Sequence, residues 1–394
     1  MVSSNRLVLR DLATPPSLLN LLCSTGDTLT RLILHLTPLS LLASLPPGQF
    51  HALQSLVYCR PSGRNWRHTS GEPVVAFQDA PSLRRVALDA TFPFTSGRNA
   101  PSFVLPWNQL THFLDFDAVS ESTLLFTPHF LSQSTYLQWL DLKLGGDDMN
   151  GNDFSHGVWE RPPGPDFMVM NSVTTLALGF PSSMAYTGMF DKVDFPSVRA
   201  LRLRAEEACW QRYGESQSRF LTKLQTFKKV EFLSLWVPRI DNGELESLFE
   251  TAPRAHTLHL FTHGLYTRVF QILEAKPELL PHLHTLVLDY NESGVRDSIE
   301  FTYLANSFRR LLEARTSNAH PTSCIRRIVV WSRDRALERE FEGVIRRFVE
   351  SDGIVFGWRL SERRENMSEA MWMEMDPTSN GWEEARVTLD LIEA

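Results

Sequence analysis

The chain has 394 residues, a formal net charge of −7 and 43% hydrophobic residues, and this composition excludes a wholly disordered chain. At roughly 100–200 residues per domain, the length allows two or three domains or one long repeat array. Residues 361–394 hold nine acidic and three basic residues, so the first 360 residues are nearly neutral. Such a balance gives no basic footprint for nucleic acid and predicts that residues 361–394 form a solvated acidic tail.

Cysteine usage and hydropathy both favour a cytoplasmic or nuclear protein, not a secreted one. Cys23, Cys59, Cys209 and Cys324 lie far apart and form no CxxC pair, which excludes the usual zinc and redox spacings. So few cysteines fit a reducing compartment. The most apolar window, Leu32–Leu45, is short and is interrupted by polar residues and a proline, so we expect no membrane association.

A short apolar motif recurs along the chain: an apolar residue, two variable residues, a second apolar residue, one variable residue, and a third. The middle positions of neighbouring copies are 25 residues apart at Leu176 to Leu201 and at Leu233 to Leu258. Repeats of about 20–29 residues with this spacing are the leucine-rich-repeat signature. Copies start at Leu29, Leu53, Leu83, Leu137, Val173, Val198, Val230, Ala255, Leu283 and Ile325, with a distorted copy at Leu110 to Phe116.

The spacing of the motif predicts a strand in each repeat. Its last two apolar residues are two apart and therefore share one face of that strand. Between the strands, four segments read as helices: 219–226, 243–251, 266–275 and 298–315. A doubly wound α/β domain would require continuous Val/Ile strands and a Gly-rich loop, and neither is present. The predicted fold is therefore an α/β leucine-rich-repeat solenoid, a horseshoe with a parallel concave sheet and helices on its convex side.

The positions of the repeat motif divide the chain into three predicted parts. Residues 1–332 form an irregular repeat array, in which 144–172 read as a long loop rich in Gly, Asp, Asn and Pro. Residues 333–360 read as a capping helix followed by a last strand, because a helical apolar stripe over 334–351 precedes Ile354 to Trp358. The acidic tail, 361–394, completes the chain.

Two segments, Ala80–Leu88 and Leu105–His112, resemble repeats of the large basidiomycete fungal group of F-box proteins with C-terminal leucine-rich repeats. The resemblance covers roughly Leu29 to Val330. It implies a substrate-recognition role in an SCF-type ubiquitin ligase, in which an F-box docks onto a Skp1-type adaptor. Here Arg6–Arg10 already reads as a repeat strand and no F-box motif is found, so we expect adaptor binding only if an F-box is restored upstream.

No arrangement of residues predicts catalysis, a cofactor or a metal site. One cluster of histidines lacks the spacing of metal ligands, and we expect its side chains to have structural or surface roles. The cluster consists of His256, His259, His263, His282 and His284. Residues 147–153 fail the EF-hand pattern and read as a polar loop. Walker, dinucleotide-binding and nucleophile-elbow motifs are missing from the sequence, so we expect no enzyme.

The variable strand positions predict a protein-binding surface. They alternate with the buried residues and should therefore face the concave side, where Trp, Phe and Arg recur as residues typical of binding hot spots. The predicted binding residues are Trp139, Arg202, Arg204, Phe232, Trp236, His259, Phe261 and Trp331. The alternative is that the loop 144–172 or the C-terminal segment folds over these aromatics and buries them. The expected function is protein binding, either in the F-box setting or as a generic repeat scaffold unrelated to ubiquitin.

Overall fold

The computed structural model places most strands and the helices beside them. It describes residues 6–9, 15–35, 37, 39–59, 73–88, 103–119, 131–144, 167–180, 190–205, 221–237, 240–260, 263–290, 298–316, 325–332 and 335–359. The chain packs as two compact units, one of residues 1–181 with 185–197 and one of residues 182–184 with 198–394. The division at residue 198 falls inside the predicted array. The acidic tail lies outside the described residues, and the three-part division stays a prediction.

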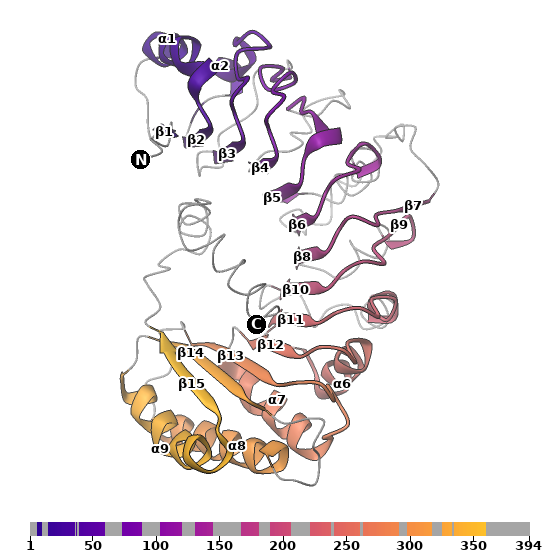
Figure 1. Ribbon diagram of the computed structural model, residues 1–394, viewed down its shortest axis with the longest axis vertical. Coiled ribbons are helices and arrows are strands. Elements are labelled where there is room, and N and C mark those ends of the chain that lie inside the picture. The colour runs from indigo at the N-terminus through magenta and orange to yellow at the C-terminus, as the bar shows by residue number, and fades with distance from the viewer. Residues whose placement is uncertain are drawn as a thin grey trace, which may run out of the picture. The chain divides into compact units, whose positions relative to one another are not determined.

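The first unit contains a parallel sheet whose strands follow one another in chain order (Figure 1). Each strand pairs in parallel with the next, and the helices α1 (Pro15–Thr25) and α2 (Leu39–Ala43) accompany the first strands. The strands are β1 (Arg6–Leu9), β2 (Arg31–His35), β3 (Ser55–Cys59), β4 (Arg85–Leu88), β5 (His112–Val119), β6 (Trp139–Leu144) and β8 (Thr175–Phe180). Strand β1 confirms that Arg6–Leu9 belongs to the repeats.

The second unit repeats this plan with longer helices, which lie together on one face of its sheet (Figure 1). Its strands are β10 (Ala200–Ala205), β11 (Phe232–Trp236), β12 (Thr257–Leu260), β13 (Thr285–Tyr290), β14 (Arg327–Ser332) and β15 (Val355–Arg359). Its helices are α6 (Asn242–Thr251), α7 (His263–Ala275), α8 (Ser298–Thr316) and α9 (Arg335–Asp352). The helices predicted at 243–251, 266–275, 298–315 and 334–351 are confirmed to within three residues at each end.

The apolar motif forms continuous buried columns in each unit. In the second unit Leu201, Leu233, Leu258, Leu286 and Ile328 occupy one level of the sheet, and each is at most 1% exposed. The same alternation puts the residues between them on the opposite face of the sheet. This face carries the variable strand positions that the sequence pattern assigns to the concave side, and it is named the outer face below. Leucine columns beneath a parallel sheet, one per repeat, make the fold an α/β leucine-rich-repeat solenoid, as the sequence predicts.

A backbone ladder fixes the start of each strand. The carbonyl of the residue just before a strand accepts hydrogen bonds from two successive N–H groups of the next repeat. The Glu231 carbonyl accepts from His256 N at 2.9 Å and Thr257 N at 3.2 Å, and the His256 carbonyl accepts from His284 N at 3.0 Å and Thr285 N at 2.9 Å. The ladder therefore aligns the residues that precede the strands, and their side chains form a row.

Two local departures from the expected pattern appear in the first unit. The end of the predicted loop 144–172 is not loop: β7 (Met168–Val169) pairs in parallel with β9 (Val193–Asp194). Met168 N donates to the carbonyl of Lys192, just before β9, and Met170 N donates to the carbonyl of Asp194. The distorted repeat at Leu110 to Phe116 coincides with a register shift between Asp115 and Val119 in the pairing of β5 with β6. Between these two pairs β5 advances four residues and β6 two, so the irregularity absorbs two extra residues of β5.

The helix layer of the second unit is held by aromatic and polar contacts. The rings of Phe270, Phe308 and Phe341, on α7, α8 and α9, lie 5.1 Å apart at each step. The side chain of Arg315, on α8, is fully buried and donates hydrogen bonds to three backbone carbonyls. Among the described helices, none is both long and apolar enough to cross a membrane.

Candidate functional site: the outer sheet face and the polar row beside it

The strand register brings several predicted binding residues together on the outer face of the second unit. Arg202 on β10 pairs with Ser234 on β11, which pairs with His259 on β12. Arg204 pairs with Trp236 one level further along the strands. Adjacent strands lie about 4.8 Å apart, so these side chains occupy one continuous stretch of the face. The register expected from the sequence is confirmed here.

These side chains differ in accessibility. Phe232 is fully buried and His259 is 5% exposed, whereas Arg202, Arg204 and Trp236 are half-buried. The guanidinium carbon of Arg202 lies 5.7 Å from the centroid of the Phe232 ring, and that ring lies 6.2 Å from the His259 ring. A cation over an aromatic face is attracted to it. Phe232 therefore supports Arg202 from below, and the accessible part of the group is Arg202, Arg204 and Trp236.

The remaining predicted residues are not part of this group in the described structure. Trp139 belongs to the first unit, where it is 6% exposed and stacks on His112 with ring centroids 6.1 Å apart. Burial, with a smaller contribution from the charge of Arg85, lowers the pKa of His112 to about 3. Phe261 and the side chain of Trp331 lie outside the described residues.

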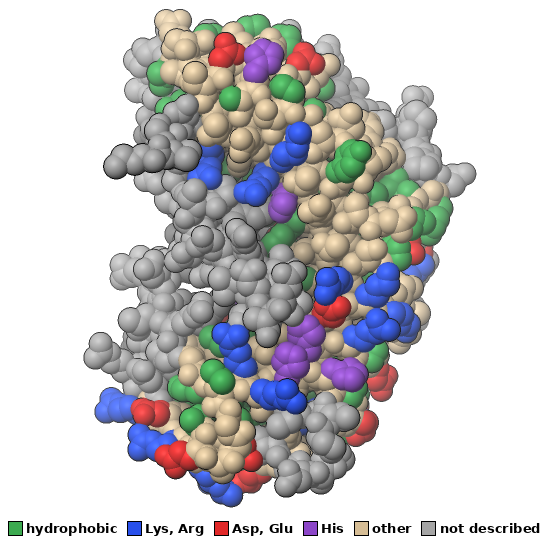
Figure 2. All heavy atoms as spheres, in the orientation of Figure 1, with side chains coloured by type: hydrophobic (Ala, Val, Ile, Leu, Met, Phe, Trp, Pro, Cys, Tyr) green, Lys and Arg blue, Asp and Glu red, His purple; other side chains and the backbone are tan. Residues whose placement is uncertain are grey.

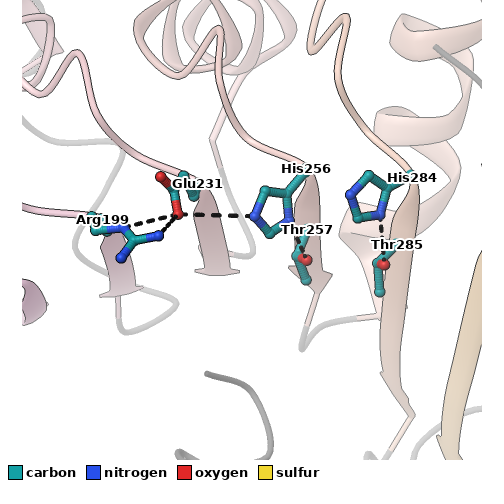
Figure 3. A network of polar contacts seen from close by, with 6 residues as sticks. All are labelled: Arg199, Glu231, His256, Thr257, His284 and Thr285. Carbon is teal, nitrogen blue, oxygen red and sulfur yellow. Dashed lines mark hydrogen bonds and ion pairs between the residues drawn. The ribbon is translucent and has the colours of Figure 1, made fainter. Parts of the chain in front are cut away.

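Beside the outer face, a row of polar side chains follows the starts of the strands (Figure 3). Arg199 donates two hydrogen bonds to Glu231 Oε2, at 2.9 Å from Nε and 2.6 Å from Nη2. The same carboxylate oxygen lies 4.0 Å from His256 Nε2. The His256 ring stacks on His284 with centroids 4.9 Å apart and planes 5° from parallel. Arg326 holds the next position of the row, because the backbone ladder continues from His284 to Arg326.

Threonines orient both imidazole rings of the row. His256 Nδ1 lies 3.1 Å from Thr257 Oγ1, and His284 Nδ1 lies 3.0 Å from Thr285 Oγ1. Both threonines are buried on the outer face at the first position of their strands. Each histidine therefore contacts its own threonine through Nδ1, and Nε2 of His256 faces the Glu231 carboxylate.

The pKa values of both histidines are lowered. Partial burial is the main cause for each. For His256 the Glu231 carboxylate opposes this effect, while Arg199 and His282 reinforce it. For His284 the nearby His256 and Arg326 lower the pKa further. Both rings are therefore neutral near pH 7 and gain charge on acidification.

The place of each residue within its repeat predicts this row, although composition alone does not. The histidine cluster is conspicuous, but the rings that meet are 28 residues apart and hold the same place in their repeats. Each follows the first apolar residue of its repeat, Ala255 or Leu283, as Glu231 follows Val230. Aligning the repeats by that residue would have put the two histidines side by side.

The described residues offer no group of three or more His, Cys, Asp or Glu side chains that could hold a metal ion. His256 precedes β12 in the polar row, whereas His259 is on the outer face. The side chain of His263 lies outside the described part.

Comparisons with known proteins identify no family. No protein-family model matches the chain, and a search of curated proteins finds no match. Among solved structures, the chain is similar to the leucine-rich-repeat-containing protein LegL7 from Legionella pneumophila, with 18% sequence identity and a TM-score of 0.39. That similarity covers 78% of this chain and 97% of LegL7.

Proposed function

We propose that this chain is a non-enzymatic binding protein that receives a protein partner on the outer face of its repeat sheet. The single observation that supports the proposal most is the cluster of Arg202, Arg204 and Trp236 on adjacent strands, backed by buried Phe232. Arginine and tryptophan are the residue types that most often dominate protein interfaces. A rigid parallel sheet holds them at fixed spacing, which lowers the entropic cost of binding.

Trp236 is the central anchor of the proposed surface. A photo-crosslinking amino acid in place of Trp236 should capture the partner, and the purified partner is then measured by calorimetry. Trp236→Ala should weaken binding by about 2 kcal/mol. The matched control is Tyr303→Ala, which removes an aromatic side chain that is 53% exposed on α8. Equal affinities for the wild type and both variants would place the partner elsewhere on the molecule.

A more specific proposal is that the bound partner is a substrate of a ubiquitin ligase. The resemblance of Ala80–Leu88 and Leu105–His112 to fungal F-box repeat proteins supports a role in substrate recognition for an SCF-type ubiquitin ligase, in the cytoplasm or nucleus. Residues 1–394 alone should not bind a Skp1-type adaptor, because Arg6–Leu9 is already a repeat strand paired with β2. Calorimetry with the purified adaptor tests this, and tight binding would contradict it. An F-box joined upstream would itself bind the adaptor, so a generic scaffold unrelated to ubiquitin is distinguished by its captured partner, which the reconstituted ligase would leave without ubiquitin.

A further inference from the structure

The polar row of the second unit is unequally charged along its length. At one end, Arg199 neutralises Glu231 through paired hydrogen bonds. At the other end, Arg326 is exposed and Arg327 is half-buried, and neither forms an ion pair with any residue in the described ranges. Figure 2 shows histidine side chains gathered beside Lys and Arg side chains on this part of the molecule. The row therefore ends in a cationic patch.

The patch consists of His282, His284, Arg326 and Arg327. His284 Nδ1 faces Thr285, so its Nε2 is the ring nitrogen left for an external group. Arg326 takes the next position of the row on the neighbouring strand, at the spacing of parallel strands, about 4.8 Å. One carboxylate fits between an imidazole N–H and a guanidinium at this spacing, because it has two oxygens to accept hydrogen bonds.

We propose that this patch docks an acidic, carboxylate-rich peptide segment of a partner protein. Charge complementarity is the reason for choosing this occupant: Arg326 and Arg327 are positive, and His284 adds charge as it is protonated. The carboxylate that faces the row, Glu231, is already held by Arg199 and lies on the far side of His256.

Binding should strengthen as the pH falls. The charged and titratable groups that act on His284 are His256 from the β12 side and Arg326 from the β14 side. His282, just before β13, acts on His256. An added carboxylate would offset their repulsion and favour the protonated imidazole. The acidic peptide thus binds the protonated form more tightly, and by linkage its affinity rises on acidification.

The patch is independent of the outer-face site proposed above, since the two share no residue. Fluorescence anisotropy with the full chain and a labelled peptide of alternating Glu and Ser tests it. Arg326→Gln should weaken binding about three- to fivefold. Arg309→Gln is the control, because Arg309 is exposed on α8 and away from the sheet. Trp236→Ala should also leave binding of this peptide unchanged, so the two proposals fail separately.

Two further comparisons sharpen the test. The gain in affinity between about pH 7.5 and about pH 5.5 should shrink in His284→Gln, and raising salt from about 0.05 M to about 0.5 M should weaken binding of the peptide. A matched peptide of Gln and Ser should not bind. The proposal is overturned if Arg326→Gln binds the acidic peptide as tightly as wild type. It is equally overturned if a single-stranded oligonucleotide binds more tightly than the peptide and depends on Arg326.

Discussion

Replacement of the buried Arg315 by methionine should destabilise the second unit locally. Arg315 donates to the carbonyl of Leu273 at 3.3 Å, of Leu279 at 2.8 Å and of Leu280 at 3.4 Å. The Leu273 carbonyl depends on this contact, because the residue four positions later is Pro277, which has no N–H to donate. Burial lowers the pKa of Arg315 to about 10, so the guanidinium remains charged at neutral pH.

The magnitude follows from counting acceptors. Without Arg315, the Leu280 carbonyl still accepts from Leu283 N at 3.0 Å, but the carbonyls of Leu273 and Leu279 lose their donor. Each buried carbonyl left without a donor costs about 1–3 kcal/mol. Part of this is offset because the buried charge no longer needs to be desolvated. We expect Arg315→Met to lower the local free energy of unfolding by about 3 kcal/mol.

Hydrogen exchange followed by mass spectrometry measures this locally, which matters because the two units need not unfold together. Amides of α8 and of residues 276–284 should exchange faster in Arg315→Met, while those of β10 change little. Arg315→Lys keeps a positive charge but presents it on one ammonium group, so its loss of local stability should lie between that of the wild type and that of Arg315→Met. Arg309→Met on the same helix is the matched control. A loss below about 1 kcal/mol in Arg315→Met would refute the reasoning.

Two further predictions concern the core and pH. Leu201→Asp places a charge in the buried leucine column and should lower the free energy of unfolding by at least about 3 kcal/mol. The control is Val355→Asp, at a position that is 61% exposed, which should change stability little. A melting temperature of Leu201→Asp close to that of the wild type would contradict the strand register. For His112, the folded-state pKa of about 3 lies below the ordinary 6.5, so the unfolded state binds the extra proton and stability is lost as pH falls from 6.5 toward 3. His112→Gln should flatten that loss in denaturant titrations at several pH values, and an unchanged pH profile would rule the histidine out.

The repeat strands could be predicted from the sequence because one physical requirement generates both the pattern and the fold. Residues such as Leu233 and Leu235 must be buried, and burial recurs at the same place in every repeat, so apolar spacing reports the register directly. The strand β7 could not be predicted in the same way. It is two residues long, and its partner β9 is supplied by a distant segment, so no periodicity marks it.

The outer face was predictable in register but not in accessibility. Alternation assigns Phe232 and His259 to that face correctly, yet it assumes that a face turned away from the leucine columns is open. Phe232 is instead fully buried, with Arg202 above its ring and His259 beside it. Burial depends on which groups cover a side chain in the folded protein, and the pattern within a single strand carries no information about that.

The polar row shows why recognition can vary where the fold does not. From β2 to β14, apart from the short strands β7 and β9, the residue before each described strand is polar. Its backbone carbonyl accepts a hydrogen bond from the next repeat wherever that hydrogen bond is described. The fold therefore uses the backbone at this position and leaves the side chain unconstrained. The first unit carries Thr30, Gln54, Arg84, Thr111, Gln138 and Thr174, and the second carries Arg199, Glu231, His256, His284 and Arg326. Charge and titratable rings concentrated in the second set serve no need of the backbone ladder, which forms equally well with Thr and Gln. That contrast supports a binding role for the row, since stability alone would not require charged side chains there.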